Sequence, residues 1–207
     1  MRPGTGIIAL LLACSLLLSA CGDSSPRLPR LAENTVILAF GDSLTYGTGA
    51  DKNQSYPAVL SKLTGRTVIN AGIPGEVSAQ GRDRLPALLD RHRPELLLLC
   101  HGGNDLLRRI NAAVTRTNIE SMIEAATQRN IPVLLIGVPK PGLMFLDAAD
   151  IYSEIAEKYE LVYEGDILPD VESDNALKSD QIHPNADGYQ RIAAAIYQLM
   201  TKSGALP

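Results

Sequence analysis

Short apolar runs alternate with helical patterns along residues 35–207, and this alternation constrains the fold more than any other feature. The five runs are Val36–Phe40, Thr67–Ile69, Glu95–Cys100, Ile131–Val138 and Leu161–Tyr163. They are mostly apolar rather than alternating, which is typical of strands buried on both faces. The sequence therefore predicts a three-layer α/β/α sandwich with a central five-stranded parallel sheet, of the flavodoxin-like kind.

Amphipathic segments separate the predicted strands. Helices are expected at Tyr56–Leu63, Ser78–Arg91, Thr117–Arg129, Ala148–Lys158 and Ala186–Met200. The chain has 207 residues, which is enough for one domain with a hydrophobic core. In such a sheet ligands bind at the carboxyl ends of the strands, so the residues that directly follow each strand are the candidates for function.

Residues 1–20 have the features of a lipoprotein signal peptide. Arg2 supplies a positive charge, residues 7–18 are almost wholly apolar, and two small residues precede Cys21. The apolar run is too short for a stable transmembrane helix. The sequence Leu18-Ser19-Ala20-Cys21 resembles the lipobox, in which the cysteine thiol receives a diacylglycerol and the signal is cut before it. The alternative is plain secretion with cleavage near Ala20.

Residues 21–34 are polar and proline-bearing, and we expect them to form a flexible tether between the lipid on Cys21 and a hydrolase domain at 35–207. The protein is then exported and anchored to the bacterial cell envelope. Gly22 follows the lipidated cysteine, which in a Gram-negative cell resembles outer-membrane cargo facing the periplasm. Cys14 leaves with the signal, so Cys100 remains without a partner for an internal disulfide. We expect Cys100 to be a buried small apolar residue, because a thiol nucleophile in an apolar strand has no activator.

Composition excludes or weakens several classes of partner. The net charge is −4 and no Lys/Arg stripe stands out, which argues against nucleic acid. Trp is absent and aromatic residues make up 4% of the chain, which weakens a carbohydrate role. With three His and one free Cys in the mature domain, no metal constellation appears, and we expect no cofactor. A monomer is expected, with a small ester as substrate.

Four strand ends carry chemistry-bearing residues. The first strand runs into Gly41-Asp42-Ser43-Leu44, where Ser43 starts a helical turn whose free N–H groups favour negative charge. Alone, Asp or Ser there is also a common helix cap. The second strand leads to a loop containing Gly72 and Gly75, and the third to Gly103-Asn104-Asp105. Near the C-terminus, Asp180 and His183 are three residues apart, so one turn can bring the carboxylate to the imidazole.

Together, these segments resemble the conserved blocks of the SGNH (GDSL) hydrolase family, in order and spacing, across nearly the whole mature domain. Bacterial arylesterases and thioesterase I/lysophospholipase L1 enzymes are similar by eye, including over residues 81–89. The resemblance implies that Ser43 is the nucleophile, His183 the general base and Asp180 the residue that orients it. It also implies an oxyanion hole of the Ser43 N–H, the Gly75 N–H and the Asn104 amide, with Gly75 preferred to Gly72. Gln181 departs from the glycine that is frequent in the family.

The remaining candidates have structural interpretations. His101 stands beside Asn104 but has no helpful carboxylate partner, so we expect a supporting role, and His92 lies at a solvated helix end. Asp42 and Asp105 are expected to bond local backbone rather than react. Leu143, Met144 and Phe145 follow the fourth strand and either line an acyl or aryl pocket or pack on the domain. The pattern Gly-x-Ser-x-Gly is absent, which argues against the α/β-hydrolase fold.

The sequence therefore predicts a serine esterase that cleaves carboxylic esters through an acyl-enzyme, with thioesters and lysophospholipids as related substrates. A deacetylase of envelope glycans, such as a peptidoglycan O-acetyl esterase, is the second hypothesis. A non-catalytic envelope lipoprotein is the third, although a binding role would not require Ser43, Asp180 and His183 together.

Overall fold

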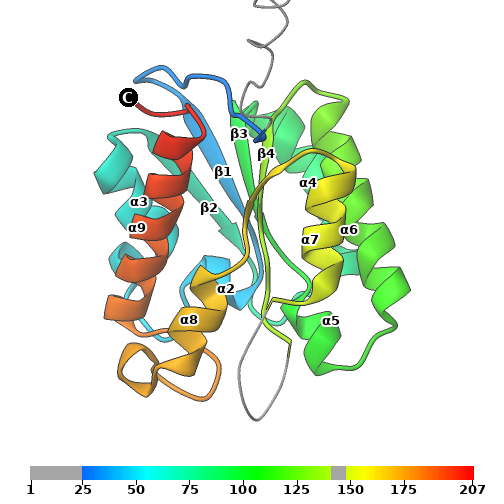
Figure 1. The fold of residues 1–207 in the computed structure, drawn as a ribbon, viewed down its shortest axis with the longest axis vertical. Coiled ribbons are helices and arrows are strands. Elements are labelled where there is room, and N and C mark those ends of the chain that lie inside the picture. The colour runs from blue at the N-terminus through cyan, green and yellow to red at the C-terminus, as the bar shows by residue number, and fades with distance from the viewer. Residues whose placement is uncertain (1–24, 141–147) are drawn as a thin grey trace, which may run out of the picture.

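A five-stranded parallel sheet forms the centre of the computed structural model, which describes residues 25–140 and 148–207. The strands are β1 (Val36–Gly41), β2 (Thr67–Gly72), β3 (Leu96–Cys100), β4 (Val133–Ile136) and β5 (Val162–Glu164). Their order across the sheet is β2-β1-β3-β4-β5, and every neighbouring pair is parallel. Figure 1 shows all strands ending at the edge that carries α2, α5 and α8. The predicted sheet is confirmed.

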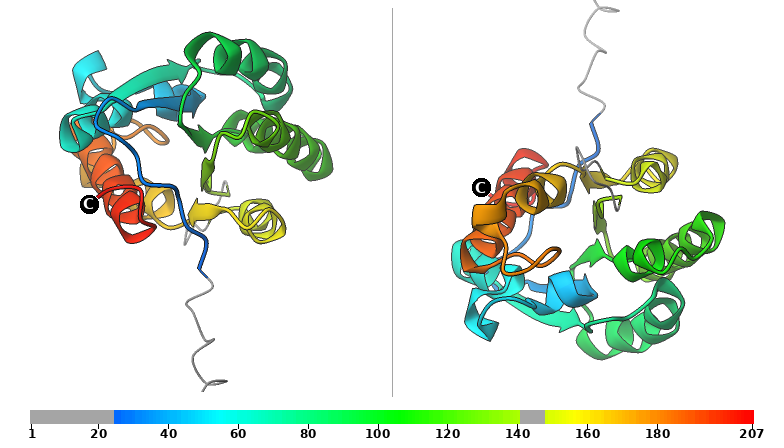
Figure 2. Two further views of the ribbon diagram at one scale, coloured as in Figure 1. Left: turned by 90° about the horizontal axis from the view of Figure 1, so that it is seen from above. Right: turned by 90° about the horizontal axis from the view of Figure 1, so that it is seen from below.

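Helices cover both faces of the sheet, as the strand–helix alternation predicted. One layer contains α3 (Tyr56–Thr64) and α9 (Ala186–Lys202), and the other contains α4 (Ser78–His92), α6 (Ala112–Thr127) and α7 (Asp150–Lys158). Figure 2 shows the two layers on opposite sides of the strands. The short elements α2 (Ser43–Tyr46), α5 (Gly103–Leu107), α8 (Ile167–Ser173), η1 (Lys52–Gln54) and η2 (Asn175–Leu177) complete the described part. The three-layer α/β/α sandwich is confirmed.

The register brings the ends of the first three strands to one level. Gly41 lies opposite Cys100 on one side and Gly72 on the other. Glycine is required at two of these positions, because a Cβ on Gly41 would overlap the Cys100 carbonyl and a Cβ on Gly72 would overlap the Tyr46 backbone. The chain segments that leave these strands therefore start side by side at the carboxyl edge.

Strands β2 and β4 and helix α6 differ from the sequence prediction, and β4 spans Val133–Ile136 rather than Ile131–Val138. The strand β2 lies at the edge of the sheet and is only partly buried, so it does not have the two buried faces that its apolar run suggested. The helix α6 begins at Ala112, five residues before the predicted start, because the Asn111 side chain accepts a hydrogen bond from the Ala113 N–H at 2.9 Å and caps it there.

The segment before β1 packs on the domain from Leu28 onward. Leu28 and Leu31 are buried, and their N–H groups donate to the Ser203 and Ala205 carbonyls at 3.0 and 2.9 Å. Arg66 donates to the carbonyls of Leu31 and Ala32. The predicted tether covers residues 21–34, but its part from Leu28 onward is packed on the domain rather than flexible. Figure 1 shows this segment crossing the amino end of the sheet.

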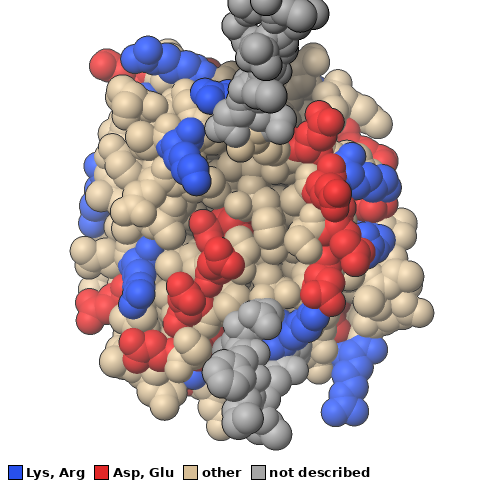
Figure 3. Space-filling view, viewed as in Figure 1, with Lys and Arg blue, Asp and Glu red and all other residues tan. Residues whose placement is uncertain are grey.

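Charged side chains are unevenly distributed on the face seen in Figure 3, where acidic groups gather over α7 and α8 and basic groups are scattered. Asp150, Glu154 and Glu157 are exposed residues of α7. Among the described helices, none is long and apolar enough to cross a membrane.

Candidate active site

Ser43 stands at the junction between β1 and α2. It is partly exposed, and it follows Asp42, whose carboxylate accepts a hydrogen bond from the Leu44 N–H at 3.1 Å. Asp42 therefore bonds local backbone, as predicted. No acceptor among the described residues takes the N–H of Ser43, so this donor at the start of α2 is available to a substrate oxygen.

His183 and Asp180 lie in the loop between η2 and α9, and the loop brings the imidazole to Ser43. Ser43 Oγ is 3.0 Å from His183 Nε2, and Asp180 Oδ2 is 2.7 Å from His183 Nδ1. The loop is closed by a bond from the Ser179 N–H to the His183 carbonyl at 2.9 Å. Residues separated by 140 positions in the sequence thus form one continuous chain of hydrogen bonds.

The Asp180 carboxylate is held by its own turn. Its Oδ1 accepts from the N–H groups of Ile182 and His183, each at 2.8 Å, while Oδ2 faces the imidazole. The backbone bond from His183, the imidazole bond and the Ile182 bond together lower the pKa of Asp180 to about 2. The carboxylate therefore stays ionised near neutral pH and fixes the imidazole with its proton on Nδ1. His183 Nε2 is then the acceptor for the Ser43 hydroxyl.

Asn104 and Gly75 reach the same edge from α5 and from the loop after β2. The Asn104 Nδ2 donates to the Glu76 carbonyl at 3.0 Å and to the Asp42 carboxylate at 3.2 Å. Both amide protons therefore have protein acceptors, and donation to a substrate oxygen requires one of these bonds to be shared or exchanged. Gly75 has a φ of 78°, which favours glycine, and no acceptor among the described residues takes its N–H.

Asp42 is a buried carboxylate next to the nucleophile. Burial raises its pKa, while the charges of His101 and His183 and the hydrogen bonds from Leu44 and Asn104 act in the opposite direction. Its contacts are with Leu44 and Asn104, so its role is to hold the turn and the amide rather than to exchange protons with substrate.

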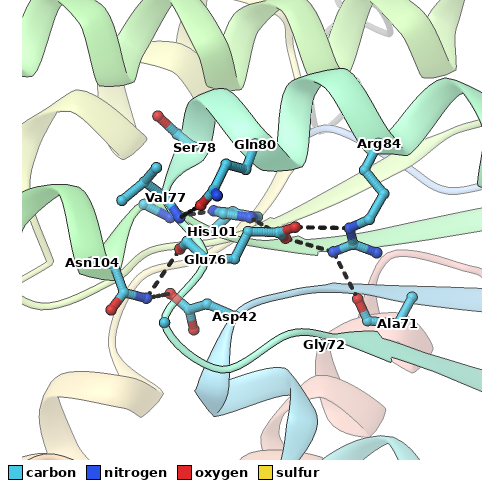
Figure 4. Close-up of polar contacts among 12 residues, drawn as sticks. Asp42, Ala71, Gly72, Glu76, Val77, Ser78, Gln80, Arg84, His101 and Asn104 are labelled. Atoms are coloured by element: carbon cyan, nitrogen blue, oxygen red, sulfur yellow. Dashed lines mark hydrogen bonds and ion pairs between the residues drawn. The ribbon is translucent and has the colours of Figure 1, made fainter.

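Sequence reasoning missed two charged residues beneath this edge, Glu76 and Arg84. Glu76 is buried although it follows an exposed glycine, and it pairs with Arg84 and with His101 (Figure 4). Burial alone would raise the pKa of Glu76, but the hydrogen bonds from His101 and Arg84, together with the charge of Arg84, lower it to about 2. The sequence did contain a signal for Arg84. It stands three residues after Gly81 and four before Leu88, so it lies on the same face of α4 as these residues.

The other predicted residues have clear outcomes. His101 is buried and lies 3.0 Å from Glu76, so the expectation that it has no carboxylate partner was wrong, and it does not contact Ser43. Cys100 is buried as expected, and burial raises the pKa of its thiol well above the usual value. Asp105 accepts bonds from Ser78 and Thr115 on other helices, so the expectation of local backbone bonding was wrong for this residue. His92 is the last residue of α4.

The predicted pocket residues Leu143, Met144 and Phe145 lie outside the described residues. Within the described ranges, no three His, Cys, Asp or Glu residues gather as a possible metal site.

Comparison with known proteins gives results in agreement with this geometry. The model of the GDSL-like lipase/acylhydrolase family matches residues 39–191. The chain is 31% identical over 193 residues to Esterase TesA of Pseudomonas aeruginosa, covering 88% of this chain and 96% of that protein. It is 33% identical over 171 residues to thioesterase 1/protease 1/lysophospholipase L1 of Escherichia coli, covering 79% and 82%.

Solved structures show the same fold. The crystal structure of the SGNH-hydrolase family esterase AlinE4 superimposes with a TM-score of 0.62 at 34% identity, covering 84% of this chain and 98% of that chain. The crystal structure titled TesA has a TM-score of 0.71 at 28% identity, covering 81% and 99%. With these matches added to a serine, an imidazole and a carboxylate in hydrogen-bond contact, the chain belongs to the GDSL-like lipase/acylhydrolase family and is a serine hydrolase of ester bonds.

Proposed function

We propose that Ser43 is the nucleophile, that His183 is the general base and then the general acid, and that Asp180 orients His183. The observation that carries this proposal is the continuous contact from Ser43 Oγ through the imidazole to Asp180, at 3.0 and 2.7 Å. As Ser43 Oγ attacks the ester carbonyl, its proton passes to His183 Nε2, and Asp180 stabilises the imidazolium. His183 then returns the proton to the leaving alcohol, and water releases the acyl group by the same route.

The negative charge that develops on the carbonyl oxygen needs donors at the carboxyl edge of the sheet. We assign this role to the N–H groups of Ser43 and Gly75 and to the Asn104 amide, in agreement with their free or exchangeable hydrogen bonds. Removing one such donor typically lowers kcat by about 10²- to 10³-fold.

The proposed substrates are carboxylic esters with short acyl or aryl groups, with thioesters and lysophospholipids as further candidates. Support comes from the names of the relatives, which include an esterase, a thioesterase/lysophospholipase and an arylesterase from Vibrio mimicus at 31% identity. A panel of p-nitrophenyl esters, an acyl thioester and a lysophospholipid would rank these classes by kcat/KM. Ser43→Ala should abolish turnover of all of them, and its full retention would overturn the assignment.

We also propose that residues 1–20 are removed and that Cys21 is lipidated, so that the enzyme is anchored in the cell envelope. The described segment supports an anchor at this end, because it is fixed at Leu28 and crosses the amino edge of the sheet, opposite the site (Figure 1). Cys21→Ser should move the protein from the membrane fraction to the soluble fraction and abolish incorporation of labelled palmitate. Unchanged fractionation and labelling would contradict the anchor.

A further inference from the structure

The strongest unexplained feature is a buried ionic cluster under the loop that follows β2 (Figure 4). Arg84 forms a fork on the Glu76 carboxylate, with Nε 2.9 Å from Oε1 and Nη2 2.6 Å from Oε2. His101 Nε2 approaches Oε2 at 3.0 Å. The exposed fractions of these side chains are 6% for Glu76, 0% for His101 and 23% for Arg84. Burying such charges is costly, so their presence at this place calls for a function.

The imidazole is fixed as a donor to the carboxylate. Its Nδ1 accepts from the Gly102 N–H at 2.9 Å, so the proton resides on Nε2 and points to Glu76. The helix α4 passes close enough that a Cβ on Gly81 would overlap Nε2. The absence of a side chain at position 81 is therefore what lets His101 reach the carboxylate.

Arg84 joins the cluster to the sheet. Its guanidinium carbon lies 4.2 Å from the centroid of the Phe40 ring, two residues before Asp42, and its Nη2 donates to the Ala71 carbonyl at 3.1 Å. A planar, always-charged group suits these simultaneous contacts, which a lysine would not reproduce. The carboxylate of Glu76 is thus held by Arg84 of α4 and by His101, which directly follows β3, and Arg84 is itself bonded to the end of β2.

The backbone of Glu76 leads directly to the reacting centre. Its carbonyl accepts from Asn104 Nδ2 at 3.0 Å, and its amide is joined to Gly75, whose own carbonyl is held by Arg108 at 2.9 Å. A shift of the Glu76 side chain therefore moves the carbonyl that sets the Asn104 amide. It also disturbs the turn closed by the bond from the Glu76 N–H to the Ile73 carbonyl at 3.2 Å, and Gly75 lies within this turn.

We propose that Glu76, clamped by Arg84 and His101, is a positioning residue that sets the Asn104 amide and the Gly75 N–H for the transition state. The proposal rests on the oxyanion roles assigned above. Glu76 does not touch substrate, and it acts only through the two donors. Substituting Glu76 should therefore lower kcat more than it changes KM, because the two donors stabilise the transition state rather than the bound substrate.

The first test is Glu76→Gln, which keeps the shape of the side chain but replaces one carboxylate oxygen with an NH2 group. This group is a donor and cannot accept the hydrogen bonds of Arg84 and His101. We expect kcat to fall about 10- to 100-fold with KM changed less than about 3-fold. Asp90→Asn is the matched control. Asp90 also lies in α4 and accepts two hydrogen bonds from one arginine, Arg129, at 2.7 and 3.2 Å, but it is exposed. This substitution should leave kcat unchanged. A folded Glu76→Gln variant with wild-type kcat would overturn the proposal.

The second test is rescue at His101, which remains informative if Glu76→Gln folds poorly. The Nε2 of a glutamine lies near the position of the imidazole Nε2 and can donate to Glu76 in its place. We therefore expect His101→Gln to have a kcat close to that of the wild type and His101→Leu to have a clearly lower kcat. Equal kcat values for the two variants would show that the donor to Glu76 has no part in catalysis.

The third test is a double-mutant cycle with Asn104→Ala. If Glu76 acts through this donor, Glu76→Gln should reduce kcat by a clearly smaller factor in the Asn104→Ala background than in the wild type. The same factor in both backgrounds would overturn the proposal. Ser43→Ala is measured alongside as a separate test of the proposed function. If this variant kept its turnover, the proposed function would be refuted, whatever the outcome of the double-mutant cycle.

Discussion

At the scale of single residues, the site depends on carboxylates whose protonation is suppressed by their neighbours. Asp180 is about half exposed, yet two backbone N–H groups and the imidazole lower its pKa to about 2. The sequence predicted Ser43, Asp180 and His183 as candidates, because their motifs are local and ordered, and the structure places them in hydrogen-bond contact. Sequence reasoning missed Glu76 and Arg84, because eight positions separate them and only the turn after Gly75 brings them together.

Asp180→Asn should keep the turn while removing the charge that fixes the imidazole. The amide would present either a donor to Nδ1 or a weaker acceptor, so the wrong tautomer of His183 gains population. We expect kcat to fall about 10³-fold or more, with KM little changed. Steady-state kinetics on a p-nitrophenyl ester measure both, and a loss below about 10-fold would show that Asp180 is not the orienting residue.

The stability contributed by Glu76 should depend on pH with a definite sign. Its pKa in the folded protein, about 2, is below the ordinary value of 4.5, so the stabilisation is complete above about pH 5 and is lost as the pH falls toward 2. At pH 7, Glu76→Gln leaves Arg84 without its ion-pair partner, which costs about 3–5 kcal/mol and lowers Tm by about 6–20 °C. The Tm difference between the two proteins should shrink steadily between pH 5 and pH 2. A constant difference would contradict the ion pair.

At the scale of helices and strands, all five strands and the five long helices were predictable, whereas most of the short helices were not. A buried strand such as β3 is predicted by its unbroken apolar run, and α9 is predicted by its strong amphipathic periodicity. The helices α5 and α8 have only five and seven residues, too few to show a clear period, and α2 was predicted only as a helical turn that starts at Ser43. The extent of the packed segment before β1 was likewise unpredictable, since it depends on contacts with residues near the C-terminus.

Gly81→Ala is a test of the packing between α4 and β3. Alanine favours a helix over glycine by about 1 kcal/mol, so an isolated helix would gain stability. Here the added Cβ overlaps His101 Nε2, and overpacking of this kind costs about 1–3 kcal/mol. We therefore expect a lower Tm by thermal unfolding. In a His101→Ala background the same substitution should raise Tm or leave it unchanged, and an equal loss in both backgrounds would place the strain elsewhere.

At the scale of the whole molecule, the two ends of the sheet have separate tasks. The carboxyl edge carries the proposed catalytic residues, and the amino edge carries the packed segment before β1 (Figure 1). With the lipid anchor we propose, the site would face away from the membrane that holds it, across the thickness of the domain. Family resemblance predicted the activity, whereas this arrangement follows only from the structure.

The segment before β1 should behave as part of the domain. A chain that begins at Ser25 keeps Leu28 and Leu31, whereas one that begins at Thr35 loses two buried leucines worth about 1.5–3 kcal/mol each. We expect the shorter chain to unfold at a clearly lower temperature or urea concentration. Equal midpoints for the two chains would show that the segment contributes nothing to the fold.

In the reaction that we propose, Ser43 is activated by His183 and Asp180 and attacks the ester carbonyl. The most direct test is to treat the protein with an aryl phosphonate ester that modifies activated serines, and to locate the adduct by peptide mass spectrometry. We expect a single adduct on Ser43, absent in Ser43→Ala and formed at least about 10³-fold more slowly in His183→Ala. An adduct on another residue, or undiminished ester hydrolysis in Ser43→Ala, would contradict it.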